Sequence, residues 1–553
     1  MQNKKYPFIL IFIITINFSL LAQDVYQHIS NKNIYEFVDE LANQGIIEIN
    51  SAIKPYSRSF IAGKLAQAAS DEQKLNKRQK KEIGFYLLEY KLEVDSVPDY
   101  NPKFDLFGKN KNLATAVNPL GLFYKDKLFT LSVKPIWGIN YFFNENGSIY
   151  HRWGGGEAFG YIGKHWGFYA SLRDNSESKR ISEADFFTLR PGGAYKITTG
   201  GGGDYSEMRG GVTFSWRWGS VGLVKDHLTW GTNYHGANIF TDRAPSFAQI
   251  KLSVKPVKWF ELNYYHGWLV SMEVDSVRSY YSTNPPREVY RPKYIAANMF
   301  TFTPWKRLNI SVGNSIIYSD MNVHPAYLIP VMFFKSIDHT VNQDIDNQNS
   351  QMFFDISSRN IKKVHLYGTL FIDELKIERI SQKDEYNFYS VKIGAATSNL
   401  GIQNLSLNVE YTMSMPLTYQ HRVPTLTYES NYYNMGFYLR DNSQEIFARI
   451  AYKPIRGLHL SAYYLLAQHG PDYIYDVNNP DEKANSHPLM EYVTWQNQTI
   501  SFKATYEFIN NAYLFVEYIS ADITGDEEQV IKYTPEFFRG KTNTISAGFN
   551  VGF

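Results

Sequence analysis

The residues best suited to metal or phosphate binding in this chain are few and incompletely arranged. Asp344, Asp346 and Asn349 could meet a Ca²⁺ ion, but their spacing falls short of a calcium-binding loop and no bidentate glutamate follows. The glycine run 200–203 before Asp204 lacks the Gly-Lys-Ser/Thr ending and the following helix of a phosphate-binding loop. We therefore expect this run to be a flexible outer loop.

The remaining reactive side chains indicate no catalytic centre. The 13 histidines are scattered without the spacing of metal ligands, and no nucleophile motif is present. The chain contains no cysteine, so thiolate chemistry, disulfides and lipoprotein acylation are excluded. We expect no enzyme activity, no metal and no cofactor.

The composition favours a membrane protein built from strands rather than helices. The chain has 553 residues, is slightly hydrophilic on average and contains 42 tyrosines. Transmembrane helices would make it more hydrophobic, whereas a transmembrane barrel alternates apolar with polar residues and carries aromatic girdles. The formal net charge of +2 leaves no basic excess to neutralise phosphates, so we expect no nucleic-acid partner.

Residues 1–22 have the pattern of a secretory signal peptide. Lys4 and Lys5 precede a short apolar stretch, and the small residue Ala22 offers a cleavage site before Gln23. A transmembrane anchor is the weaker alternative because the stretch is short for a bilayer.

Three segments with helical periodicity follow, between Asn31 and Val94. They predict a small periplasmic helical bundle over residues 23–98, joined by a linker, residues 99–127, to the rest of the chain. The charged run 77–82 is interpreted as a solvated helix face, with a lipid or partner patch as the alternative. The bundle is also a possible docking point for a periplasmic or outer-membrane protein.

Residues 128–553 repeat a pattern of strand, tight turn, strand and long polar loop. Residues 248–254 alternate apolar with polar side chains, turn at 255–258 and return over 260–268, and similar pairs flank turns at 303–306, 453–457 and 510–511. The apolar rows contain no charged residue, and a basic residue on a lipid-facing surface would cost about 2 to 4 kcal/mol. The pattern predicts an all-β transmembrane β-barrel of about 18 antiparallel strands, with about 16 or 20 as alternatives.

The last strand resembles the terminal strand of bacterial outer-membrane β-barrels. Its apolar row alternates with small polar residues and consists of Ile545, Ala547, Phe549, Val551 and Phe553. In such barrels the final aromatic residue forms part of the signal for membrane insertion. The resemblance implies the outer membrane of a Gram-negative cell, with membrane lipid and the barrel-insertion machinery as partners.

The connections between the expected strands alternate between a few residues and long loops, which is typical of short periplasmic turns and long extracellular loops. A barrel of this size encloses more space than its own strands can fill, so either other segments plug it or it conducts. The channel alternative is a porin-like or secretion-associated protein with charged residues lining an aqueous lumen: Lys251, Glu261, Arg449, Lys503 and Glu507.

Residues 222–232 and 238–247 resemble the signature of Wzi-type capsule assembly proteins, in which a strand leads into a Trp-Gly-Pro loop and an Arg-Pro-Phe-like return. Thr232 stands in place of the proline, and residues 242–244 also depart from the enterobacterial form. These departures bear on the identity of the glycan more than on the fold.

The resemblance extends over nearly the whole mature chain. Residues 327–334, followed by Asp346 and Asn347, and residues 366–374 are similar to Bacteroidetes-type members, while residues 34–46 and 55–58 resemble the family's periplasmic helical domain. The likeness implies an outer-membrane, lectin-like barrel that helps a capsular or extracellular polysaccharide assemble on, or attach to, the cell surface.

Sugar binding requires apolar faces for pyranose rings beside fixed polar groups, and aromatic-rich loops on a rigid barrel could supply both. The alternative for each such residue is an aromatic belt or a loop-packing contact. With the resemblance, the candidates for glycan binding lie in two long loops: Trp230, Tyr234, His235, Asp242, Arg243, Tyr280, Tyr281, Arg287, Tyr290 and Arg291.

Overall fold

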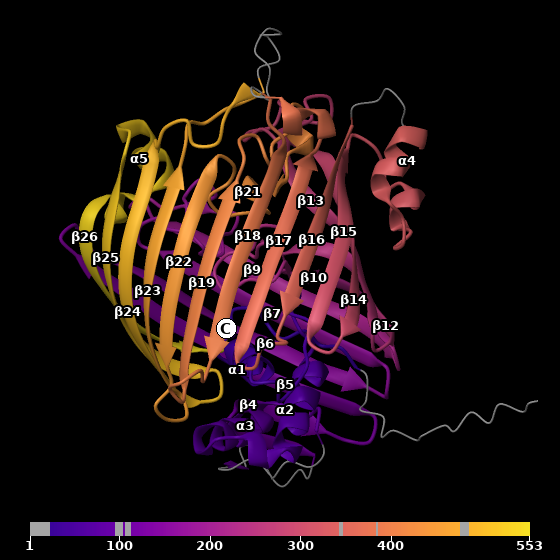
Figure 1. The fold of residues 1–553 in the computed structure, drawn as a ribbon, viewed down its shortest axis with the longest axis vertical. Helices are drawn as coiled ribbons and strands as arrows, with labels where there is room; N and C mark the ends of the chain where they lie inside the picture. The colour runs from indigo at the N-terminus through magenta and orange to yellow at the C-terminus, as the bar shows by residue number, and fades with distance from the viewer. Residues whose placement is uncertain (1–22, 95–102, 105–111, 342–346, 383–384, 476–485) are drawn as a thin grey trace, which may run out of the picture.

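Eighteen long antiparallel strands close into a barrel in the computed structural model, which describes residues 23–94, 103–104, 112–341, 347–382, 385–475 and 486–553 (Figure 1). The predicted barrel, its strand number and its N-terminal helices are confirmed. The barrel strands are β5 (Phe129–Asn144), β6 (Gly147–Ile162), β7 (Trp166–Glu177), β9 (Gly203–Trp216), β10 (Gly219–Asp226), β12 (Phe247–Val257), β13 (Phe260–Val274), β14 (Tyr290–Trp305), β15 (Leu308–Ser319), β16 (Gln348–Ser358), β17 (Val364–Glu374), β18 (Phe388–Ser398), β19 (Leu405–Ser414), β22 (Ser443–Tyr452), β23 (Leu458–His469), β24 (Trp495–Ile509), β25 (Ala512–Gly525) and β26 (Gly540–Val551).

Two features predicted from the sequence fall outside the residues that the structure describes. The expected signal peptide, residues 1–22, is one of them, and the candidate calcium ligands Asp344 and Asp346 are the other. Across the described ranges, no helix combines the length and the apolar character needed to span a membrane.

The barrel closes where its last strand meets its first. β26 pairs with β5 from Ile545 opposite Phe143 to Val551 opposite Trp137. Nearer its N-terminal end, β5 pairs instead with β4 (Leu120–Lys125), which in turn pairs with β3 (Leu113–Val117). The segment expected as a linker therefore contributes a hairpin that extends the wall beside β5.

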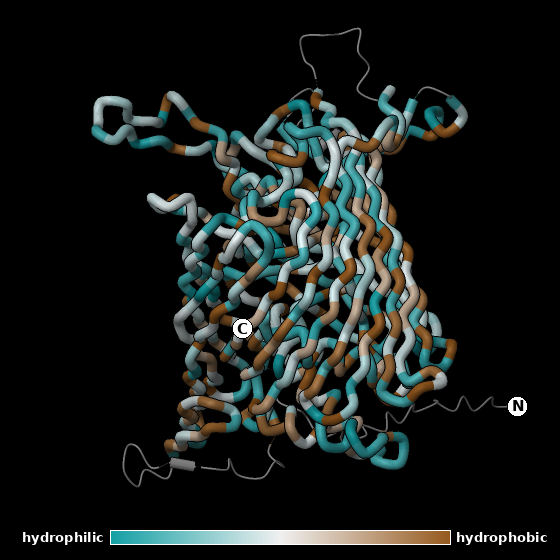
Figure 2. Tube along the Cα trace, turned by 90° about the vertical axis from the view of Figure 1, so that its left-hand side faces the viewer, coloured by the Kyte–Doolittle hydropathy of each residue, from teal (hydrophilic) through white to brown (hydrophobic). Residues whose placement is uncertain are grey.

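The two faces of the barrel wall have the polarity that the alternation predicts. On β26, the side chain of Ile545 is half exposed on the outer face, whereas those of Thr544 and Ser546 are buried on the inner face. Figure 2 shows the same alternation of apolar and polar residues along the neighbouring strands. Because strand side chains alternate with period two, the apolar row of each strand forms a continuous outer surface.

The tight turns lie close to their predicted positions. The turns at 453–457 and 510–511 are confirmed, and Asn511 adopts the positive φ (59°) that a two-residue hairpin turn favours. Pro256 and Pro304 lie at the ends of β12 and β14, one or two residues before the actual turns. The strand register shifts at both prolines, because a proline cannot donate a ladder hydrogen bond.

The three predicted helices are confirmed as α1 (Lys32–Asn43), α2 (Arg58–Ser70) and α3 (Lys77–Glu89). Gly45 follows α1 with a φ of 74°, and a side chain there would collide with the guanidinium of Arg307. The helices share a small apolar core of their own, which includes Phe37, Val38, Leu41, Ile61, Leu65, Ile83 and Tyr86.

The helical bundle packs into one end of the barrel (Figure 1). Arg359, which follows β16, donates to Asp39 at 2.9 Å and to Asn43 at 2.7 Å, both on α1. Arg449 of β22 donates to Glu36 of the same helix at 2.7 Å. These contacts join α1 to strands from two parts of the wall.

The C-terminal residue does not continue the outer apolar row, contrary to the sequence prediction. Gly552 has a φ of 85° and redirects the chain, so the side chain of Phe553 is buried inside. Its ring stacks on His28 with ring centroids 4.1 Å apart, and the guanidinium of Arg209 lies 5.4 Å from its centre. The two ends of the described chain therefore meet inside the barrel.

Candidate functional site

The first candidate loop, residues 227–246, folds into the barrel interior and is called the plug loop here. Trp230 at its start is buried against Phe240, Tyr265 and Phe353, with ring centroids 5.6, 5.1 and 6.0 Å away. Its short strand β11 (Thr229–Trp230) pairs with β1 (Ile53–Lys54) of the N-terminal domain. Trp230 is therefore a core residue where the plug loop and the helical domain join.

The middle of the plug loop is held by one buried carboxylate, that of Glu410 on β19. The backbone N–H groups of Tyr234 and His235 donate to its two oxygens at 2.6 and 2.9 Å. The Nζ of Lys392 donates to the same carboxylate at 3.0 Å, and the hydroxyl of Tyr367 also donates to it. Charge-assisted hydrogen bonds of this kind fix the position of the loop backbone.

The side chains of Tyr234 and His235 are engaged with the wall. The Tyr234 hydroxyl lies 3.0 Å from Nδ1 of His365, and the His235 ring stacks on Phe447 at 3.9 Å. Burial, together with the nearby ammonium of Lys392, holds the pKa of His235 well below its usual value. His235 is thus a neutral, packed imidazole.

Arg243, at the end of the plug loop, is buried beside the outer loops. Its Nη2 donates to the carbonyl of Glu183 at 2.9 Å, and its guanidinium lies 5.5 Å from the ring of Tyr433. Burial lowers the pKa of Arg243 to about 10, so it stays charged at neutral pH. The neighbouring Asp242 is half-buried. The structure places all five candidates of this loop inside the barrel, and their part in sugar binding stays a prediction.

The second candidate loop, residues 275–289, lies outside. Tyr280 and Tyr281 are 55% and 58% exposed. The backbones of Tyr280 and Arg287 exchange hydrogen bonds of 2.8 and 2.9 Å, and the Arg287 guanidinium lies 5.8 Å from the Tyr280 ring. At its base, Arg291 pairs with Asp320 at 2.9 Å, and Tyr290 is also exposed. This loop presents free aromatic faces beside basic groups.

Sequence reasoning missed an exposed tyrosine near the second loop. Asn431 donates its backbone N–H to the carbonyl of Val270 at the end of β13, which brings Tyr432 to the base of the second loop. Tyr432 is about half exposed. The adjacent tyrosines at 432 and 433 could have indicated an exposed aromatic side chain, because only one of two successive side chains can face the interior.

A cluster of interior tyrosines was also missed. Residues 415–442 fold into the barrel next to the plug loop. The hydroxyl groups of two tyrosines in this segment donate hydrogen bonds to backbone carbonyls of the plug loop. Tyr419 donates to Asn238 at 2.7 Å, and Tyr428 donates to Ile239 at 3.1 Å. The tyrosine excess therefore serves interior packing as well as the outer surface.

Several charged residues expected to line a channel are covered by the N-terminal domain. The Nζ of Lys251 lies 3.7 Å from the ring centre of Tyr26. Glu507 accepts hydrogen bonds from Asn33 at 2.9 Å and from Tyr86 at 3.0 Å. Part of the interior stays accessible to solvent, because the inward-facing side chain of Lys503 is 42% exposed beside Glu517.

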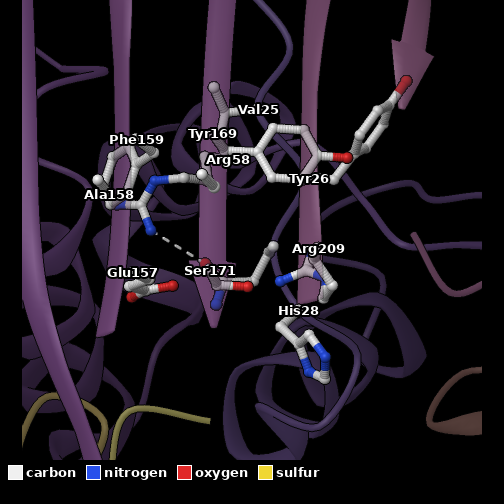
Figure 3. Close-up of a pocket in the computed structure, with 12 residues that line it drawn as sticks. Val25, Tyr26, His28, Arg58, Glu157, Ala158, Phe159, Tyr169, Ser171 and Arg209 are labelled. Carbon is white, nitrogen blue, oxygen red and sulfur yellow. Dashed lines mark hydrogen bonds between the residues drawn. The ribbon is translucent and has the colours of Figure 1, made fainter. Parts of the chain in front are cut away.

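A small cavity lies where the first described residues meet β6, β7 and β9 (Figure 3). Arg58 donates to Gln27 at 3.1 Å across it, and Tyr26, His28 and Arg209 complete part of its lining. Its volume of about 20 Å³ suits a single water molecule. It is too small for a sugar.

Comparisons with known proteins find likeness in the fold alone. Neither a family model nor a curated protein matches the chain. Among solved structures, the chain is similar to Wzi, an outer membrane protein involved in group 1 capsule assembly in Escherichia coli and described as a carbohydrate-binding β-barrel. The match has 12% identity and a TM-score of 0.55 and covers 96% of this chain and 100% of that one.

Two barrels of Pseudomonas aeruginosa match less well. OccD3 (OpdP) has 11% identity and a TM-score of 0.42, and the match covers 76% of this chain and 90% of that one. OprD has 10% identity and a TM-score of 0.40, with 76% and 94% covered.

Proposed function

We propose that this chain is a Wzi-type outer-membrane barrel that binds a surface polysaccharide and assists its assembly on, or attachment to, the cell exterior. The closed barrel with an apolar outer surface supports a position in the outer membrane. The end-to-end fold likeness to Wzi and the motif resemblance of the plug loop support a carbohydrate role. In this proposal a signal peptide directs export, the insertion machinery places the barrel, the helical bundle is periplasmic and the long loops are extracellular.

The observation that carries the proposal is the exposed second loop. Tyr280, Tyr281 and Tyr290 offer flat apolar faces, and Arg287 and Arg291 lie among them as donors. Stacking of a pyranose ring on a tyrosine, with hydrogen bonds from a neighbouring guanidinium, is the arrangement that sugar recognition uses. By contrast, Trp230 and Arg243 of the plug loop are buried. In this proposal they hold the plug loop in place and do not contact the sugar.

A binding experiment tests the proposal. Purified protein in detergent is titrated with polysaccharide isolated from its own cell surface, and the variant Tyr280→Ala/Tyr281→Ala is compared with Val277→Ser. Each aromatic face contributes about 1 kcal/mol, so we expect the double variant to lose roughly tenfold or more in affinity. Val277 is exposed in the same loop and serves as the control. Equal affinities of the two variants would remove this loop from the site.

Conductance separates the proposal from the channel alternative. The solvent-exposed, inward-facing side chain of Lys503 is the observation that favours a channel. In planar bilayers, a barrel filled by the helical bundle and the plug loop should be almost silent. Steady single-channel conductance, together with no binding of the cell's own glycan, would favour a porin-like or secretion-associated channel instead.

A further inference from the structure

Two asparagines form a polar patch on the outer wall of the barrel. Asn298 of β14 and Asn314 of β15 are direct partners across the two strands, near their middle. Both share a face with outward-facing apolar residues, Phe302 on β14 and Ile310 on β15. Amide groups at this height would face hydrocarbon, where no water can satisfy them.

The polar patch is covered by a segment of the chain outside the barrel. After β15, the chain folds back down the outer wall through η2 (Pro325–Leu328) and α4 (Phe334–Val341), and Figure 1 shows α4 beside β15. The Nδ2 of Asn298 donates to the carbonyls of Pro330 at 3.0 Å and Met332 at 2.8 Å.

The second asparagine completes this network. Asn314 donates to the Oδ1 of Asn298 at 2.7 Å and accepts from the backbone N–H of Phe334 at 2.9 Å. Farther along the same wall, the hydroxyl of Tyr264 donates to the carbonyl of Tyr327 at 2.9 Å. Residues 327–334, called the strap here, are therefore fastened at both ends by side chains of the barrel wall.

Between its two ends, the strap directs backbone carbonyls toward the barrel and apolar side chains away from it. Tyr327 and Phe334 are buried against the wall. An exposed loop in water would have the reverse polarity. The five apolar side chains that remain exposed between them are Leu328 (39%), Ile329 (40%), Val331 (63%), Met332 (36%) and Phe333 (43%).

We propose that the strap is immersed in the acyl chains of the outer leaflet and seals the asparagine patch from lipid. The exposed run continues the apolar surface of the adjoining strands, where Phe302, Phe354 and Ile356 are exposed in the same way. Lys335, exposed directly after the strap, has a stem long enough to carry its ammonium toward the headgroups. This inference rests on the proposed outer-membrane location.

Spin labelling tests the inference directly, because the chain has no native cysteine. Val331→Cys, Ile356→Cys and Tyr281→Cys are labelled separately in the full chain and reconstituted in phospholipid vesicles. The collision rates of each label with oxygen, which concentrates in hydrocarbon, and with a water-soluble nickel complex are then measured. We expect the label at 331 to match that at 356, with oxygen favoured, and the label at 281 to favour nickel.

The possible outcomes distinguish the strap from the location. If the label at 331 favours nickel while that at 356 favours oxygen, the strap lies in water and the inference fails alone. If the label at 331 is shielded from both reagents, a protein partner rather than lipid covers it, which also overturns the inference. If the label at 356 favours nickel, the membrane location itself fails.

A second variant tests the role of the asparagines. Asn298→Leu/Asn314→Leu removes the amides that fasten the strap and leaves a lipid-compatible wall. In this background the label at 331 should become more mobile and gain access to nickel, while the label at 356 should be unchanged. An unchanged label at 331 would show that the strap is held without the asparagines and would overturn their assigned role.

Discussion

At the scale of single residues, Glu410 joins the plug loop to the barrel wall. Its carboxylate accepts from two plug-loop N–H groups and pairs with Lys392, and both members of the pair are fully buried. A buried pair of this kind adds little over an apolar replacement, but removing one member leaves an uncompensated charge in a dry site. The middle of the plug loop therefore relies on this carboxylate, whereas Thr232 nearer the start of the loop donates to Asp355.

Replacing Glu410 by glutamine tests this dependence. The amide keeps the volume but leaves the Lys392 ammonium unpaired, so we expect a loss of about 3 to 5 kcal/mol in the free energy of unfolding. Thermal unfolding in detergent measures it. Glu72→Gln is the control, because Glu72 pairs with Lys80 at 3.3 Å at an exposed site where such pairs contribute about 0 to 1 kcal/mol. Similar losses in both variants would contradict the assignment.

At the scale of elements, strands were predictable and loop directions were not. The period-two alternation of Ile446, Ile450 and Tyr452 assigns the outer face of β22 without any knowledge of its neighbours. Trp230 and Tyr280 lie in similarly aromatic loops, yet one is inside the barrel and the other outside. The difference depends on partners distant in sequence, such as Glu410, which lies 176 positions beyond Tyr234.

Helix α1 depends on ionised carboxylates for its attachment to the barrel. Burial opposes the ionisation of Glu36, but Arg449 and Lys453 outweigh it and lower the pKa of Glu36 to about 2. Burial likewise opposes the ionisation of Glu40, and Lys453 with Arg78 outweighs it, so the pKa of Glu40 also lies below its usual value. A lowered carboxyl pKa stabilises the folded state above the unfolded-state pKa, and this stabilisation is lost as the pH falls through the folded-state pKa.

We therefore expect α1 to loosen in acid. Its attachment should weaken by about 1 to 3 kcal/mol between about pH 4.5 and 2. Hydrogen exchange of the α1 backbone, measured against that of β24, would record the change. In Glu36→Gln, part of this pH dependence should be absent. Weakening that begins above pH 6 would point to a histidine instead.

At the scale of the whole molecule, the chain builds a wide barrel and then fills it. Eighteen strands enclose a lumen that would conduct if it were empty. The helical bundle occupies one end (Figure 1), the plug loop joins it where β11 pairs with β1, and residues 415–442 contact the plug loop in turn. The barrel strands pair with one another and with β3 and β4, so closure of the wall does not require the bundle.

Deleting residues 23–94 should convert a silent barrel into a conducting one. The deletion uncovers Lys251, Arg449 and Glu507 while the strand ladder stays complete. Steady current steps in planar bilayers, absent from the full chain, would confirm that the bundle blocks the lumen. A variant with residues 276–288 shortened is the control and should stay silent. A silent deletion variant would show that the plug loop blocks the lumen by itself.

The stacking of Phe553 on His28 implies an order for two folding events, closure of the barrel and formation of this contact. The ring of His28, near the first described residues, stacks on Phe553, and Phe553 reaches this position only when β26 has paired with β5. This contact can therefore form only after the barrel has closed, whichever part of the chain folds first. In a refolding time course, sheet formation should precede protection of His28, and Phe553→Ala should delay only the later phase.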